Sequence, residues 1–479
     1  MASRSLRSTV FSIVLISIVF PFAHAVTDYA NVFIDPDRVV AKSFNESTAL
    51  AQKTIAQWAD SLSIGGPWSV TTKPVTPPSG NKHDYLSYAP YYWPDCSQAG
   101  NTTALSDEQA RQQCTWVQRD GQINPTSKDA SDIDNFETLG DAVLYNTLTW
   151  ALQGSSTASA NAVKFIRTWF LDADTAMAPN LNFAQMQGGP GPDDQSGTHT
   201  GVLDLKCMAK IVNGILVLRS GKSADWTSDL DGQMVGWTKE YISWLQSSPL
   251  AQREATSPNN HGTFYYNQLA SLQILVGDKD GAKNTVQTYF NTLYQHQIDA
   301  NGEQPEEAAR TRPYHYRAYN LAAMITNARL GEYVGFDAWN VKSAAGANIQ
   351  TALDFAMTIS PGDDAAEELY PNVAAVAAHY GDPTGKYGKF LMQQLSLDLA
   401  KQPFFAWDSF AVSGLPVSYT SSASSSTQVS KGSSGASPTG ASSVPNGKAP
   451  WEEDAALTAT VSWFMLAYTT SFVLFFAFC

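Results

Sequence analysis

The sequence predicts an all-α fold, an incomplete α/α toroid of antiparallel helix pairs with long loops lining a cleft. Segments with the apolar spacing of an amphipathic helix recur along the chain, mostly with lengths of roughly 12–20 residues. Alternating strand patterns are scarce, and no strand, Gly-rich loop and helix follow one another as a nucleotide-binding fold requires. Repeated antiparallel helices in a chain of 479 residues indicate a toroid or solenoid, with the loops of one rim lining the cleft.

The apolar spacing also gives the order of the expected helices, and Gly or Pro residues mark most of their ends. The segments are residues 139–150, 163–171, 208–218, 266–276, 282–294, 319–330, 349–357, 365–379 and 387–399. No break in composition separates them, so we expect one domain over residues 26–416.

Both ends of the chain have the composition of processing signals. Residues 1–25 combine an Arg-containing start, an apolar stretch and the small-x-small site Ala23-His24-Ala25, which is typical of a secretory signal peptide. Residues 417–454 form a Ser/Thr/Gly-rich stalk and polar spacer, and residues 455–479 an apolar tail. This order predicts a glycolipid (GPI) attachment signal whose tail is removed, and a retained transmembrane helix is the alternative. The protein is therefore expected outside the cell, at the cell surface or wall.

Charge and cysteine content restrict the possible partners. The net charge is −14 with only 30 Lys and Arg residues, which excludes the basic footprint of a nucleic-acid-binding protein. In an oxidising compartment Cys96 and Cys114 are the expected disulfide pair, and no Cys/His spacing indicates a metal site. The sequons at Asn45 and Asn101 predict N-glycosylation.

Two constellations could carry chemistry. Asn260 and His261 stand just before an expected helix, where an amide can hold a carboxylate while an imidazole moves a proton. An Asn-rich helix cap is the alternative reading. Arg312 and Tyr319 are seven residues apart, so they would share one side of a helix, although Pro313 makes the first turn uncertain. A guanidinium there would bind a carboxylate and favour a phenolate; a solvated helix start is the alternative.

Two loops are candidate walls of the cleft. Residues 82–95 include Lys82 and Trp93 in an aromatic-rich loop bounded by Pro, which suits stacking on sugar rings but also fits a packed loop beneath the disulfide. Residues 177–185 include Asn182 and Gln185 ahead of a Gly-rich stretch, which predicts a hydrogen-bonding wall or simply a surface loop.

Taken together, these segments resemble the alginate lyase family over about residues 82–331. The resemblance implies an α/α-toroid catalytic domain whose active site contains an Asn-Asn-His segment and a downstream Arg-x₆-Tyr pair. Asn260, His261, Arg312 and Tyr319 match that pattern, and Lys82 is the nearest candidate for a Lys that some members use. The order of residues 313–317 departs from the usual family form, so Tyr316 competes with Tyr319 as the base. The substrate-binding candidates are Lys82, Trp93, Asn182, Gln185, Tyr265 and Tyr316.

The chemistry that the resemblance implies is β-elimination on an anionic polysaccharide, alginate or a related polyuronate, without a metal or cofactor. Asn260 and Arg312 would neutralise the sugar carboxylate, His261 or Tyr319 would remove the C5 proton, and Tyr319 would protonate the leaving oxygen. One alternative is an α/α-barrel glycoside hydrolase, which needs two carboxylates across the cleft. Its candidate acids are Asp193, Asp194, Glu306, Glu307, Glu367 and Glu368. The other alternative is a glycan-binding protein without turnover.

Overall fold

The computed structural model describes residues 31–415, except 101–104 and 192. The predicted signal peptide, stalk and apolar tail, and with them any attachment site, lie outside the described residues, as does Asn101. Within the described ranges, none of the helices combines the length and the apolar character that are needed to cross a bilayer.

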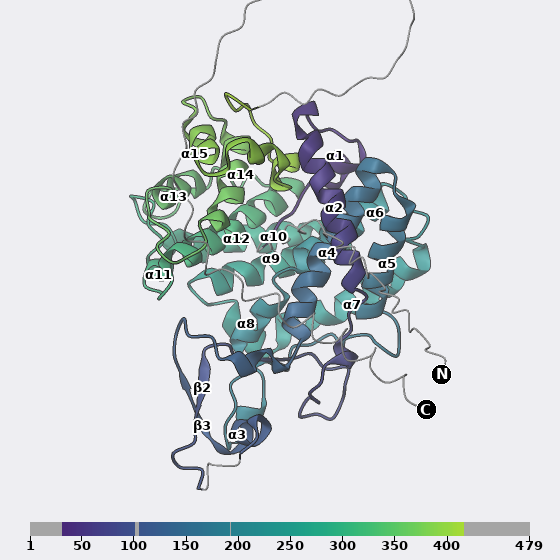
Figure 1. Cartoon of the computed structure of the whole chain (residues 1–479), viewed down its shortest axis with the longest axis vertical. Coiled ribbons are helices and arrows are strands. Elements are labelled where there is room, and N and C mark those ends of the chain that lie inside the picture. Colours follow the sequence, from purple (N-terminus) through teal and green to yellow (C-terminus); the bar gives the residue numbers. More distant parts are fainter. Residues whose placement is uncertain (1–30, 101–104, 192, 416–479) are drawn as a thin grey trace, which may run out of the picture. The chain divides into compact units, whose positions relative to one another are not determined.

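The described chain is an α/α toroid built from an inner and an outer set of helices (Figure 1). The inner helices are largely buried, and each contacts the next one along the chain. They are α4 (Asp132–Gln153), α6 (Met208–Ser220), α9 (Asn260–Leu275), α12 (Pro313–Tyr333) and α14 (Tyr370–Tyr380). The outer helices that follow them are α5 (Ser156–Phe170), α7 (Ser228–Ser247), α10 (Lys279–Asn291), α13 (Ile349–Ala356) and α15 (Lys386–Leu395). The all-α toroid prediction is therefore confirmed.

Local sequence signals fix where these helices begin and end. The α4 helix carries Asp132 and Asp134 in its first turn and stops at Gly154, which adopts the left-handed conformation with φ of 77°. The side chain of Ser155 then accepts the hydrogen bond that caps α5. The hairpin between the two helices is short for this reason, and its helices pack directly on each other.

Additional segments complete the ring. The α2 helix (Ala49–Gly65) contacts α4 on one side and the short α16 (Phe404–Trp407) on the other, and α16 contacts α14. Residues 31–34 run inside the ring before α1 (Pro36–Val40). The Asn31 amide donates to Asn267 Oδ1 at 2.8 Å, and the Ile34 backbone exchanges two hydrogen bonds with Asn213. The interior of the ring is thus filled by the chain itself.

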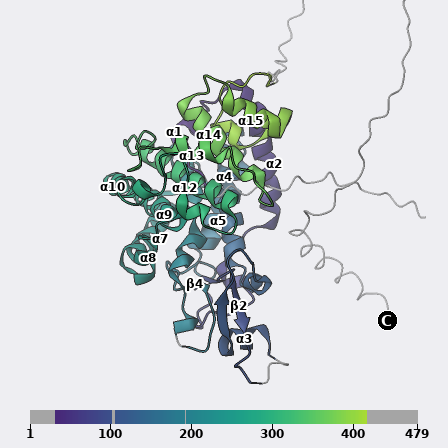
Figure 2. The same cartoon turned by 90° about the vertical axis from the view of Figure 1, so that its left-hand side faces the viewer.

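The few strands lie at one end of the helices (Figures 1 and 2). Strand β1 (Leu86–Tyr88) pairs in parallel with β4 (Phe183–Met186). Strand β2 (Tyr92–Asp95) pairs antiparallel with β3 (Thr115–Gln118), and α3 (Asp107–Gln113) lies between them in the sequence. Two short helices, α8 (Pro249–Glu254) and α11 (Pro305–Ala308), precede α9 and α12.

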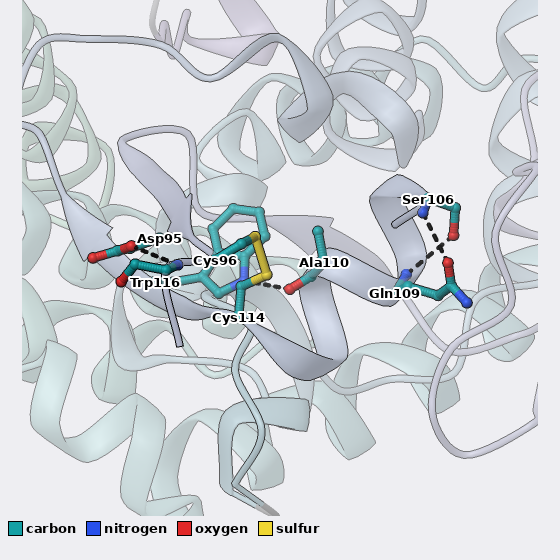
Figure 3. The surroundings of a disulfide bond; sticks show 8 residues. Asp95, Cys96, Ser106, Gln109, Ala110, Cys114 and Trp116 are labelled. Atoms are coloured by element: carbon teal, nitrogen blue, oxygen red, sulfur yellow. Dashed lines mark hydrogen bonds between the residues drawn. A yellow bond between two sulfur atoms is a disulfide. The ribbon is translucent and has the colours of Figure 1, made fainter. Parts of the chain in front are cut away.

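Residues 89–124, without the undescribed 101–104, are called the β2–β3 arm here. A disulfide joins Cys96, which follows β2, to Cys114, which precedes β3 (Figure 3). The backbone N–H of Cys114 also donates to the carbonyl oxygen of Ala110 in α3. At the base of the arm, Arg119 N–H donates to Tyr91 O at 2.7 Å. The arm is therefore a cross-linked hairpin anchored at the ring.

Candidate active site

A cavity of about 880 Å³ opens at the end of the toroid where the inner helices begin. Its wall includes residues from the first turns of α4, α9, α12 and α14, and Lys206, which lies just before α6. The base of the β2–β3 arm and residues 197–206 also contribute to the wall. Because the N-terminal end of a helix carries partial positive charge, four such ends facing one cavity favour an anionic ligand.

Asn260 enters the cavity wall at the first position of α9. The preceding Asn259 caps the helix by accepting the His261 N–H at 3.2 Å. The backbone N–H and the side-chain Nδ2 of Asn260 both donate to the carboxylate of Glu307, at 2.7 Å each. The Asn260 amide is therefore held rigidly, and its Oδ1 has no hydrogen-bond partner among the described residues. Burial raises the pKa of Glu307 to about 7, although the two bonds from Asn260 oppose this shift.

A buried carboxylate orients two imidazoles of the cavity. His261 Nδ1 lies 2.5 Å from Glu254 Oε1, and His199 Nδ1 lies 2.7 Å from Glu254 Oε2. Burial opposes the ionisation of Glu254, but the two histidines outweigh it and leave its pKa below the usual value. An ionised Glu254 accepts Nδ1–H, so the Nε2 atom of a neutral imidazole is left as a proton acceptor.

A guanidinium and a phenol meet on another part of the wall. Arg310 Nη2 donates to the Tyr316 hydroxyl at 2.8 Å, and the guanidinium carbon lies 3.8 Å from the centre of the same ring. Arg310 Nη2 also donates to Oδ1 of Asp120, a residue of the β2–β3 arm, at 2.8 Å. The Tyr316 hydroxyl also lies 3.0 Å from the Tyr91 hydroxyl. Burial raises the pKa of Tyr316, so this phenol is protonated at neutral pH.

Arg312 and Tyr319 do not come together. Tyr319 lines the cavity, where its ring packs against Phe264 and His315. Arg312 is not among the lining residues, and its Nε donates to Asp364 at 2.7 Å. The reason is local: Arg312 is the N-cap of α12, with φ −124° and ψ 68°, so the helical seven-residue spacing does not apply to it. Of the four predicted catalytic residues, the structure brings Asn260, His261 and Tyr319 to one cavity.

The predicted substrate-binding residues divide in the same way. Gln185 and Tyr316 line the cavity. Gln185 Nε2 donates to the buried Asp204 at 2.7 Å, and its backbone has a φ of 49°, a strained value for this residue. The other candidates are elsewhere: Lys82 is exposed, Trp93 donates to Gln122 O, Asn182 accepts from Trp244, and Tyr265 donates to Leu245 O. Asn45 is exposed and caps a 3₁₀ turn.

Sequence reasoning missed several polar residues of the site: Tyr91, His199, Arg253, Glu254 and Arg310. The available signal for Arg310 was its place in the Arg- and Tyr-rich stretch that precedes α12. Arg253 is exposed at the cavity wall, and no ion pair joins it to another described residue. Within the described ranges, no group of three or more His, Cys, Asp or Glu side chains is placed to hold a metal ion.

Comparisons with solved structures find proteins of similar fold. An alginate lyase from Bacteroides ovatus has a structure similar to that of this chain, with a TM-score of 0.67, 27% sequence identity, and coverage of 78% of this chain and 98% of that one. Alginate lyase A1-III from Sphingomonas species A1 is also similar, with a TM-score of 0.43, 13% identity, and coverage of 71% of this chain and 90% of that one.

No curated protein sequence matches the chain significantly. The model of the alginate lyase family, however, matches residues 69–365, which is more than half of the chain. The chain therefore belongs to the alginate lyase family and is a polysaccharide lyase.

Proposed function

We propose that this protein cleaves a polysaccharide containing uronic acid by β-elimination in the cavity at the N-terminal ends of the inner helices. The observation that carries the proposal is the meeting there of an oriented imidazole, a fixed amide and a phenol bonded to a guanidinium. β-Elimination needs a base for the C5 proton, donors for the charge that develops on the carboxylate, and an acid for the leaving O4.

The contacts support a specific division of labour. His261 takes the C5 proton on Nε2, because Glu254 occupies its Nδ1. The second N–H of the Asn260 amide and the exposed guanidinium of Arg253 stabilise the carboxylate as its charge grows.

The acid of the reaction is Tyr316. It is protonated in the free enzyme, and Arg310 stabilises the phenolate that forms when it gives its proton to O4. We assign these roles to Tyr316 and Arg310 because the Arg310 guanidinium donates directly to the Tyr316 hydroxyl, whereas the Arg312 guanidinium donates to Asp364.

The substrate class follows from the relatives and from the charge of the site. Both similar structures are alginate lyases by name, and the helix ends and Arg253 favour a polymer of acidic sugars. We therefore propose alginate or a related polyuronate as the substrate, with no metal or cofactor in the reaction.

We further propose that the protein is secreted and held at the cell surface by a GPI anchor, as the compositions of residues 1–25 and 417–479 support. Phosphatidylinositol-specific phospholipase should release an epitope-tagged protein from intact cells. Retention of the protein with its apolar tail still present would favour a transmembrane helix instead.

One assay tests the proposed activity. The secreted protein is incubated with alginate and other polyuronates, and the ultraviolet absorbance of an unsaturated uronate is followed together with reducing ends. A lyase produces the chromophore and reducing ends together. Reducing ends without the chromophore would indicate a hydrolase, and neither signal would indicate a glycan-binding protein. His261→Ala should abolish the chromophore while leaving the helical circular dichroism unchanged.

A further inference from the structure

The cavity wall carries two exposed charges of opposite sign that have no partner within the described ranges. Arg253 lies in the last turn of α8, and no described carboxylate pairs with its guanidinium. Glu367 lies in the 3₁₀ turn Ala366–Leu369, directly before α14. Its carboxylate has neither a hydrogen bond nor an ion pair with another described residue. Both side chains are therefore available to a ligand in the cavity.

The two charges lie on different sides of the cavity. The α8 helix contacts α9, whereas Glu367 directly precedes α14, and α12 lies between because it contacts both α9 and α14. Arg253 neighbours Glu254, which binds the proposed base His261, so the uronate that reacts lies on the Arg253 side. A cavity of about 880 Å³ is at the upper end of the ~300–1,000 Å³ typical of ligand pockets, which leaves room for a neighbouring sugar on the Glu367 side.

The Glu367 side has an excess of negative charge. Glu368 also lines the wall there, and its Oε2 lies 2.6 Å from Nδ1 of His315. Asp364 accepts the backbone N–H of His315 at 3.1 Å, and Arg312 offsets its charge by donating from Nε at 2.7 Å. Among the described residues, no such cation offsets Glu367. Because the two glutamates precede α14, they also counteract the partial positive charge at the start of that helix.

We propose that Glu367 is a specificity-determining residue that selects a sugar without a carboxylate next to the uronate that reacts. Every sugar of a pure polyuronate carries a carboxylate, so such a strand brings two negative charges together at Glu367, and like charges repel. A strand with neutral sugars among its uronates avoids this repulsion and still offers a carboxylate to Arg253. The inference rests on the proposed β-elimination, and it narrows the substrate to relatives of alginate in which neutral sugars interrupt the uronates.

The test is Glu367→Gln, which keeps the shape of the side chain and removes its charge. The two substrates are alginate and the same alginate in which part of the carboxyl groups has been reduced to alcohols, so that both have the same linkages. We expect kcat/KM on alginate to rise by about threefold to tenfold in the variant, because the repulsion is lost. On the reduced polymer the value should change by less than about twofold, since neutral sugars already reach the Glu367 side.

Two further variants separate this local effect from net charge. Glu240→Gln on α7 makes the same change of net charge at an exposed position outside the cavity wall, and it should leave kcat/KM on both polymers unchanged. Arg253→Gln should lower kcat/KM on both polymers, because it removes the cation that meets the reacting uronate. Circular dichroism verifies the folding of each variant, and Glu367→Ser should show the same gain on alginate as Glu367→Gln.

Salt gives an independent measurement of the same repulsion. Between about 0.01 M and 1 M salt the Debye length falls from about 30 Å to about 3 Å. The advantage of Glu367→Gln over the wild type on alginate should therefore shrink towards none as salt is added. An advantage that does not depend on salt would contradict an electrostatic role for Glu367.

Equal kcat/KM of the wild type and Glu367→Gln on alginate would overturn the selectivity, and so would a loss of activity on both polymers. If the wild type still forms the chromophore from alginate and His261→Ala does not, the proposed function stands and only the selectivity fails. If the wild type forms no chromophore from either polymer, both proposals fail.

Discussion

At the scale of single residues, the site depends on which arginine reaches the cavity. Arg310 and Arg312 are two positions apart, but Arg310 contacts the Tyr316 phenol and Arg312 contacts Asp364. The spacing argument for Arg312 assumed that the helix includes it, whereas Pro313 begins α12 and leaves Arg312 in a non-helical conformation. The residue types of the site were therefore predictable from the sequence, and the choice between neighbouring residues was not.

This difference predicts opposite outcomes for two similar variants. Arg310→Ala removes the donor that stabilises the Tyr316 phenolate, and kcat should fall by about 100-fold or more. Arg312→Ala breaks a partly exposed ion pair with Asp364 and should keep kcat within a few-fold of the wild type. Steady-state kinetics on a polyuronate, with circular dichroism to verify folding, measure both. Equal losses in the two variants would contradict the assignment.

Glu254 gives a second prediction at this scale. Glu254→Gln keeps the size of the side chain but removes the charge that the two imidazoles share. We expect kcat to fall by about tenfold or more, because a neutral amide oxygen accepts the Nδ1–H of His261 more weakly than a carboxylate and fixes the imidazole less well. A wild-type kcat in this variant would contradict the role of Glu254 in orienting the base.

At the scale of elements, the helices differ in how clearly the apolar spacing of the sequence predicts them. The α6 and α10 helices were predictable because their apolar residues follow a helical period. The pattern for α9 and α12 was recognised only from residues 266 and 319, because the first turns of both helices carry the polar residues of the site. The polar residues that the cavity needs therefore interrupt the apolar pattern, so the sequence does not show where these two helices begin.

Among the described helices longer than ten residues, α7 and α2 were not predicted. In α7 the buried residues Met234, Trp237, Tyr241 and Leu245 do follow helical spacing, but Gly232 and Gly236 interrupt the pattern. In α2 the buried positions are few, namely Ala51, Ile55, Trp58 and Ala59. Each of these helices contributes a narrow stripe to the ring, and a narrow stripe is a weak signal in the sequence.

Removing the disulfide of the β2–β3 arm should affect activity more than the stability of the helical domain. Replacing Cys96 and Cys114 together by Ser releases the cross-link that closes the arm, worth about 2–4 kcal/mol when a whole domain unfolds around it. We expect kcat to fall because Tyr91 and Asp120 lose their fixed positions. We expect the thermal midpoint of the helical domain to change little, because the arm projects from the ring. Limited proteolysis should cut the variant within the arm. Full activity in the double variant would show that the cross-link does not support the site.

At the scale of the whole molecule, buried carboxyl groups predict the pH dependence of stability. Burial raises the pKa of Asp132 and of Asp204 from 3.8 to about 6, and that of Glu307 from 4.5 to about 7. The folded state therefore holds these protons more tightly than the unfolded chain. This contribution to stability is complete below about pH 4 and is lost as the pH rises through 6 to 7.

We expect the free energy of unfolding of the helical domain to decrease by on the order of 1–3 kcal/mol between pH 4.5 and pH 7.5. The net charge of −14 at pH 7 adds self-repulsion in the same direction. Urea denaturation at several pH values measures the slope. Asp204→Asn should flatten that slope whatever its effect on stability itself, and an unchanged slope would show that Asp204 does not titrate in this range.

The segment inside the ring has a further consequence for how a polymer is handled. Val32, Phe33 and Ile34 are each less than 5% exposed, and Asn31 forms part of the cavity floor. A polysaccharide therefore cannot pass through the centre of the toroid, because residues 31–34 occupy it. In the part of the chain that the structure describes, both fragments of a cut are therefore expected to leave at the end of the ring where the cavity opens, and not through its centre.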